Sequence, residues 1–189
     1  MIGSTIVELA MSLKQLAMMT GLTGLLAAGL GCDATAARSD SASASRQISA
    51  APCITPEEAD RMADEVLQLV NLERATIGVP PVETNATLEK IAGRYACRMV
   101  SDAFFGHQDP RTGHGPGERA VAGRYAFYSV GENLAAGQES AAEAVKVWME
   151  SPAHRRIILD SKWTQVGIAV RTGGEYGIYW VQEFGDPAE

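Results

Sequence analysis

Three short segments in the second half of the chain carry the ionisable side chains best suited to chemistry. They are FFGHQDP (104–110), GENLAAG (131–137) and WMESPAHRRIIL (148–159). Two of the chain's three histidines, His107 and His154, lie in the outer two segments, and Glu132 lies in the middle one. Glycine or proline interrupts each segment, which is typical of turns rather than of core packing. We therefore expect a site that is assembled from loops far apart in the sequence.

Each of these side chains has a plausible chemical role. His154 is expected at the third position of a helix that Ser151 caps, where the positive helix end disfavours the imidazolium form. A neutral imidazole there can accept a proton or bind a metal. Glu132 could ligate a metal, orient a histidine or act as a general base. A solvated loop residue is the alternative at each position, and for His114, which lies between glycines, it is the simpler interpretation.

The first 32 residues are expected to be an export signal rather than part of the fold. Lys14 precedes an apolar run, LAMMTGLTGLLAAGLG, that is short and glycine-rich for a membrane span. The run ends at Cys32, and the whole segment resembles a bacterial lipoprotein signal. In such a signal the cysteine is diacylated and becomes the new N-terminus, so we predict lipidation of Cys32. An ordinary cleaved secretory signal is the alternative.

The composition that follows predicts a tethered single domain. Residues 33–52 are rich in serine and alanine, so they bury too little apolar surface to offset the entropy cost of ordering. We expect a flexible tether there and one domain with a single core over 53–189. The formal net charge of −7 argues against nucleic acid or an anionic membrane surface as a partner. The expected location is the cell envelope, on the periplasmic or outer side.

The two remaining cysteines are expected to form a disulfide. On the helix predicted over 85–103, Cys97 lies away from the apolar stripe made by Leu88, Ile91, Ala92, Tyr95 and Met99. A free thiol on a solvent-exposed face is a liability outside the cytoplasm. A Cys53–Cys97 disulfide is therefore favoured over two unpaired thiols.

Helical periodicity dominates the first half of this domain. TPEE (55–58) combines a threonine cap, an early proline and a glutamate at the third position, and predicts the start of a helix. A second helix should run over about 85–103, with Asn85 as its cap. The glycine-rich stretch 106–137 is expected to be mostly loop, with a short helix at about 117–123.

The pattern changes towards the C-terminus. Ser140 begins a capping box for a third helix, and Ser151 precedes a shorter one. Over 166–170 apolar residues alternate with smaller or polar ones, which predicts a strand. Turn residues follow at 172–175, and a second strand is expected over 176–184. Helices followed by a terminal hairpin predict an α+β or layered α/β fold with an antiparallel sheet.

Taken together, the order and spacing of these segments resemble the CAP superfamily of cysteine-rich secretory proteins, insect-venom antigen 5 and plant pathogenesis-related proteins. The similarity covers about 62–185 and is greatest to the bacterial branch, the SCP-like extracellular domains. It is carried by VLQLVNLERATIGVPPV, LEKIAGRYACRMVSDAFFGHQDP, GENLAAG, WMESPAHRRIIL, TQVGIAV and YGIYWVQEFG. The resemblance implies an α-β-α sandwich with a central, mainly antiparallel sheet, a C-terminal hairpin and a large cleft.

The resemblance also implies a set of site residues. In animal and plant members two histidines and two glutamates line the cleft and can hold a divalent metal, often Zn²⁺. By motif, His107 matches the first histidine and Glu132 the first glutamate. Lys162 stands where the second histidine would be, and Ser151 stands about where the second glutamate would be. His154 belongs to the bacterial motif and could replace the missing imidazole, so His107, Glu132 and His154 form the predicted metal or catalytic site.

Three functions are compatible with this pattern. The first is an exported, lipid-anchored domain that binds a lipid, peptide or glycan in its cleft. The second is a peptidase-like hydrolase with His107 or His154 as base and a metal or Glu132 as stabiliser. Against it, no serine or cysteine nucleophile lies in a recognisable elbow. The third is a non-catalytic interaction module of the cell envelope.

Overall fold

The computed structural model describes residues 51–188. The predicted signal over 1–32, the predicted lipidation site Cys32 and positions 33–50 of the predicted tether lie outside these residues. The elements in chain order are α1 (Ala59–Thr76), β1 (Glu83–Thr84), α2 (Ala86–Ser101), α3 (Pro116–Ala122), β2 (Phe127–Ala136), α4 (Ala141–Glu150), α5 (Pro152–Ile158), β3 (Gln165–Gly173) and β4 (Gly177–Pro187). No helix in this part of the chain has the length and apolar character that a membrane crossing requires.

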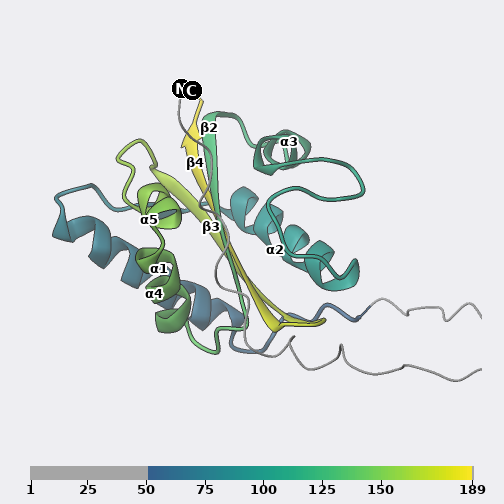
Figure 1. Ribbon diagram of the computed structural model, residues 1–189. Helices are drawn as coiled ribbons and strands as arrows, with labels where there is room; N and C mark the ends of the chain where they lie inside the picture. The colour runs from purple at the N-terminus through teal and green to yellow at the C-terminus, as the bar shows by residue number, and fades with distance from the viewer. Residues whose placement is uncertain (1–50, 189) are drawn as a thin grey trace, which may run out of the picture. The chain divides into compact units, whose positions relative to one another are not determined.

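The described strands form one sheet between two helical layers, with the strand order β1-β3-β4-β2. β1 pairs with β3 in parallel, whereas the β3–β4 and β4–β2 pairs are antiparallel. Helices α1, α4 and α5 cover one face of the sheet, and α2 and α3 cover the other (Figure 1). The predicted α-β-α sandwich with a mainly antiparallel sheet and a C-terminal hairpin is therefore confirmed.

Each face of the sheet has its own apolar core because strand side chains alternate between the two sides. Val166, Val170 and Trp180 pack with α1 and α4, whereas Ala169 and Val181 pack with α2. At Gly167 the start of α2 lies directly on β3, since a Cβ there would stand only 2.1 Å from the backbone carbon of Leu88. The sheet therefore fixes the position of α2, whose far end leads into the loop with His107.

Arg74 fixes the connection between α5 and β3. Its side chain is fully buried and donates hydrogen bonds to the carbonyls of Pro80, Ile158, Asp160 and Trp163, at 2.7–3.1 Å. A buried guanidinium is tolerated when its donors are satisfied in this way. Because two of these carbonyls lie at or just after the end of α5, Arg74 also holds the helix that carries His154.

The predicted caps Asn85 and Ser140 are confirmed, the one at Thr55 is wrong, and Ser151 precedes α5 without a side-chain cap hydrogen bond. The side chain of Asn85 accepts from the backbone N–H groups of Thr87 and Leu88, and that of Ser140 accepts from Glu143. The first helix, however, begins at Ala59, not after a cap at Thr55. The TPEE segment forms a turn instead, because the carbonyl of Pro56 accepts the N–H of Ala59 at 3.0 Å.

The prediction that 106–137 is mostly loop is wrong for its last third. Residues 127–136 form β2, a ten-residue strand whose partner from Val130 to Ala136 is β4 without a break. The central residues Gly131, Glu132 and Asn133 have no apolar alternation, so the strand pattern is hidden in the sequence. The consequence is that Glu132 lies on a buried strand rather than on a solvated loop.

The predicted Cys53–Cys97 disulfide is present. It joins the first described residues to α2, and next to it Ile54 and Thr172 exchange backbone hydrogen bonds of 2.8 and 2.9 Å. The N-terminal segment of the domain is therefore attached to both α2 and the β3–β4 hairpin.

Removal of the disulfide should destabilise the domain. The closed loop separates the cysteines by 44 positions, for which the loop-entropy model gives about 4 kcal/mol. We expect the Cys53→Ala/Cys97→Ala double variant to lose this amount in urea unfolding. Reduced wild-type protein is the control and should fall to the same value. A double variant as stable as the oxidised protein would contradict the assigned role.

Candidate functional site

The centre of the candidate site is a contact between His107 and Glu132. The Nδ1 atom of His107 lies 2.7 Å from Oε1 of Glu132. Because a carboxylate only accepts, the imidazole donates from Nδ1 and leaves Nε2 without its proton when neutral. The Glu132 side chain is 1% exposed, whereas that of His107 is 51% exposed. The imidazole of His107 is therefore exposed to solvent, and a buried carboxylate fixes its orientation.

Arg119, from α3, fixes this carboxylate. Its guanidinium contacts Oε2 of Glu132 and lies 3.4 Å from Oε1 of Glu183. It also donates to the backbone carbonyls of His107 and His114, at 2.9 and 3.2 Å. The guanidinium carbon lies 3.4 Å from the centre of the Tyr95 ring, a cation–π contact. These contacts come from three separate parts of the fold, so Arg119 joins α2, the loop after it and the sheet.

Glu183 is the second carboxylate of the site. β4 places it directly opposite Glu132 in the antiparallel register, and it is almost fully buried. Burial, and then the charge of Glu132, raise the pKa of the Glu183 carboxyl well above its ordinary value. The fold therefore favours the neutral form of Glu183, and Glu132 is the carboxylate in closer contact with Arg119.

His154 lies beside this cluster without joining it. Its backbone carbonyl accepts from the side-chain amide of Asn133 at 3.3 Å, and Asn133 follows Glu132 on β2. Successive strand residues point to opposite faces, so His154 approaches β2 from the α5 side. Burial, and then the charge of His107, lower the pKa of the His154 imidazole. Over residues 51–188 no hydrogen bond joins its ring to His107 or Glu132, and its buried Nδ1 has no partner.

The donor set does not fit a resident divalent metal. Within residues 51–188 no three histidine, cysteine, aspartate or glutamate side chains are grouped so that they could share an ion. Arg119 already contacts both carboxylates, so a second cation there would face a fixed positive charge. Lys162 is half-exposed and pairs with Asp160 at 3.2 Å, and Ser151 serves as the N-terminal residue before α5. The cation that contacts both carboxylates in the described residues is the guanidinium of Arg119.

Sequence reasoning did not identify two members of this cluster, Arg119 and Glu183. A signal for Glu183 exists, because it is the one carboxylate in the otherwise apolar and amide-bearing run YWVQEFG of a predicted buried strand. Arg119 had no such signal, since an arginine on a short helix is normally solvated. The third histidine, His114, contributes only its backbone carbonyl to the contact with Arg119.

The comparisons with known proteins agree with this architecture. The model of the CAP family, described as the cysteine-rich secretory protein family, matches residues 67–184. The chain therefore belongs to the CAP family.

Two relatives and two solved structures illustrate its range. The uncharacterized protein YkwD of Bacillus subtilis (strain 168) is 33% identical over 129 residues, which is 68% of this chain and 49% of that protein. The uncharacterized membrane protein YlbC of the same organism is 27% identical over 56% of this chain and 30% of its own length. This chain thus spans about half of the length of the first relative and 30% of the length of the second.

Among solved structures, an outer surface protein from Borrelia burgdorferi has a TM-score of 0.64 at 22% identity, over 72% of this chain and 98% of that one. An extracellular protein with an SCP domain from Bacillus anthracis str. Ames has a TM-score of 0.62 at 24% identity, over 70% of this chain and 44% of that one. At these identities the likeness shows a shared fold.

The raised pKa of Glu183 predicts how the free energy of unfolding depends on pH. The folded protein binds this proton more tightly than the unfolded chain does. The proton therefore makes its full contribution to the free energy of unfolding below the ordinary pKa of 4.5, and this contribution is lost as pH rises towards the folded pKa. Glu183→Gln should remove this loss and flatten the pH dependence by up to about 1.4 kcal/mol per pH unit. Urea unfolding at several pH values above the ordinary glutamate pKa measures it.

The exposed carboxylate Glu150 on α4 provides the matched control. Glu150→Gln should leave the slope unchanged. If Glu183→Gln and wild-type protein show the same slope, the pKa of Glu183 is not raised in the fold and the assignment is wrong.

Proposed function

We propose that this protein is an exported, lipid-anchored CAP-domain protein that binds a lipid, peptide or glycan at the surface around His107. One observation carries the proposal: an imidazole that is half-exposed is held in a single orientation by a carboxylate that is itself buried and paired. A side chain fixed in this way before binding loses little conformational entropy when a ligand accepts or donates a hydrogen bond. Such pre-organisation is expected of a binding residue and unnecessary for a solvated one.

Two exposed aromatic rings form an apolar contact surface, and one of them lies two residues before His107 in the sequence. Phe105, two residues before His107, is 43% exposed, and Tyr176 is 45% exposed. Their ring centres are 5.7 Å apart, and Tyr179, which contacts both rings, is fully buried. Exposed aromatic rings on a rigid base are typical anchors for ligands with an apolar face. The polar His107 and these rings together support a ligand with both polar and apolar parts.

Export and anchoring rest on the first part of the sequence. The apolar run before Cys32 supports a lipoprotein signal, and the Cys53–Cys97 disulfide is typical of an oxidising compartment. Structural relatives described as an outer surface protein and an extracellular protein support the same location. We infer that a diacylated Cys32 anchors the domain to a membrane, with residues 33–52 as the tether.

Mass spectrometry of the intact protein isolated from its native host should test the anchor. The mature chain is expected to begin at Cys32 and to carry the mass of a diacylglyceryl group. Cys32→Ala should release the protein from the membrane fraction into the soluble exported fraction. A mature chain that begins elsewhere and carries no lipid would favour the ordinary secretory signal.

Substitution of His107 should test the binding surface. We expect His107→Ala to weaken binding of the true ligand by at least about tenfold, because a charge-assisted or oriented hydrogen bond is lost. Glu132→Gln should also weaken binding, since it frees the imidazole from its fixed orientation. Suitable probes are phospholipid vesicles, peptidoglycan fragments and a peptide library, measured by calorimetry.

His114→Ala is the matched control, because its imidazole makes none of the contacts of the His107–Glu132 pair. Equal weakening by both histidine variants, or none by either, would place the ligand elsewhere on the domain.

The His107–Glu132 contact also supports a second candidate function, a hydrolase. A histidine oriented through Nδ1 by a carboxylate can accept a proton from water at Nε2, while the water oxygen attacks a peptide or ester carbonyl. The imidazolium can then return this proton to the leaving amine or alcohol as the bond between it and the carbonyl carbon breaks. Both oxygens of Glu132 are occupied, by His107 and Arg119, so Glu132 would orient the base rather than act as one. A hydrolase would lose turnover in Glu132→Gln while substrate binding persists, whereas a carrier would show no turnover in any variant.

A further inference from the structure

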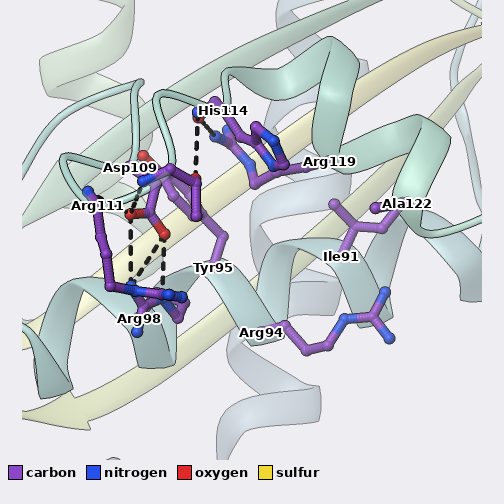
Figure 2. Close-up of a pocket in the computed structure, with 10 residues that line it drawn as sticks. Ile91, Arg94, Tyr95, Arg98, Asp109, Arg111, His114, Arg119 and Ala122 are labelled. Atoms are coloured by element: carbon purple, nitrogen blue, oxygen red, sulfur yellow. Dashed lines mark hydrogen bonds and ion pairs between the residues drawn. The ribbon is translucent and has the colours of Figure 1, made fainter.

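A hollow lies beside Arg119, next to the His107–Glu132 pair. It has a volume of about 290 Å³ and is bounded by α2 on one side and by the 109–114 loop and α3 on the other (Figure 2). Neither His107 nor Glu132 lines it. Its lining includes Arg94, Arg98, Arg111 and Arg119, with Asp109 as the single carboxylate. The hollow is therefore distinct from the His107 surface, although Arg119 contributes to both.

The hollow is strongly positive in an acidic protein. Four of the chain's 16 lysines and arginines line this one cavity, although the formal net charge of the chain is −7. Guanidinium groups repel one another, so their accumulation around a cavity is costly unless anions compensate them. Such a concentration of positive charge attracts an anionic ligand.

Two of these arginines have internal partners and two do not. Arg98 pairs with Asp102 and Asp109, and Arg119 pairs with Glu132 and Glu183. By contrast, the guanidinium groups of Arg94 and Arg111 form no ion pair with any residue between 51 and 188. In Figure 2 Arg111 lies at one end of the hollow, on the side of Arg98, and Arg94 extends from α2 at the other end. The hollow thus offers two uncompensated charges.

The loop that presents Arg111 is held in a fixed shape. The carboxylate of Asp109 accepts the backbone N–H groups of Arg111 and Thr112, at 2.8 and 3.2 Å, and the side chain of Arg98 at 3.1 Å. The Arg98 hydrogen bond is the largest of the effects that lower the pKa of Asp109 to about 2. The backbone N–H of Asp109 in turn donates to the carbonyl of His114 and closes the loop. The carboxylate of Asp109 therefore bonds to the loop backbone and to Arg98, and it forms no ion pair with Arg111.

We propose that this hollow binds a phosphate monoester group. Such a group carries a charge of about −1.5 to −2 at neutral pH, which complements a lining of four arginines and one carboxylate. Arginine is well suited to this partner because its planar donors bind two phosphate oxygens at once. Ile91, Tyr95 and Ala122 supply an apolar wall for the organic part of the ligand. The volume is near the lower limit for ligand sites and suits a headgroup-sized molecule.

This inference does not depend on the function proposed for the His107 surface. It assigns a second site with its own ligand chemistry, which a phospholipid headgroup or a soluble phosphate ester could supply. The two sources are separated below by the choice of probe.

Calorimetric titration with glycerol 3-phosphate tests the site. We expect saturable binding to the purified mature protein, weakened by at least about tenfold in Arg94→Gln and in Arg111→Gln. Both side chains are exposed, so the variants should fold, and thermal unfolding checks this. Arg61→Gln is the matched control: it removes the same charge from α1, where Arg61 pairs with Glu58 and Glu65 outside the hollow, and should leave affinity unchanged.

A second titration identifies the source of the phosphate. Phosphatidylcholine vesicles that contain phosphatidic acid should bind with the same dependence on Arg111 if the ligand is a lipid headgroup. Binding of glycerol 3-phosphate without vesicle binding would indicate a soluble ester, and either result supports the site.

Three results would overturn the inference: no saturable binding of either probe, equal weakening by Arg61→Gln, or equally tight binding of acetate. His107→Ala should leave phosphate binding intact, so a failure here is distinguishable from a failure of the proposed function.

Discussion

The candidate site depends on one guanidinium placed between two buried carboxylates. Arg119 contacts both Glu132 and Glu183, which the β2–β4 register sets opposite one another. Two ionised carboxylates this close would repel strongly in a dry interior, and one arginine without them would be a buried unpaired charge. Burial and the neighbouring Glu132 favour the neutral form of Glu183, which reduces this repulsion. The position of His107, and therefore the proposed binding surface, follows from this arrangement.

The guanidinium of Arg119 is also the main difference between this site and the family pattern. The resemblance assigns two histidines and two glutamates to the cleft, and this chain has Lys162 and Ser151 at two of those positions. Glu183 supplies a second carboxylate from a different strand, and Arg119 supplies the positive charge. The guanidinium of Arg119 is a fixed cation that contacts both carboxylates. Its planar donors also reach two backbone carbonyls of the 107–114 loop, which a small ion at the carboxylates could not do.

The sequence predicted the fold better than the site, for physical reasons. Caps such as Asn85 and Ser140 are local signals, and the disulfide followed from the helical position of Cys97. His107 and Glu132 were proposed as site residues from motifs of the family, together with His154, and in the structure the first two side chains lie 2.7 Å apart. Strand β2 was missed since its polar centre hides the alternation, and with it the partnership of Glu132 and Glu183. That partnership, like the role of Arg119, is set by strand register and helix packing, which no local pattern encodes.

The attachment of the first described residues has a mechanical consequence. Cys53 is bonded to α2, and Ile54 is hydrogen-bonded to Thr172 near the end of β3. Tension applied to the chain before Cys53 would enter the domain first through a covalent bond and then through β3. The β2–β4 ladder that holds Glu132 and Glu183 carries neither attachment. A load on the leading end would instead act on α2, whose Tyr95 contacts Arg119 and whose last turn leads into the loop with His107.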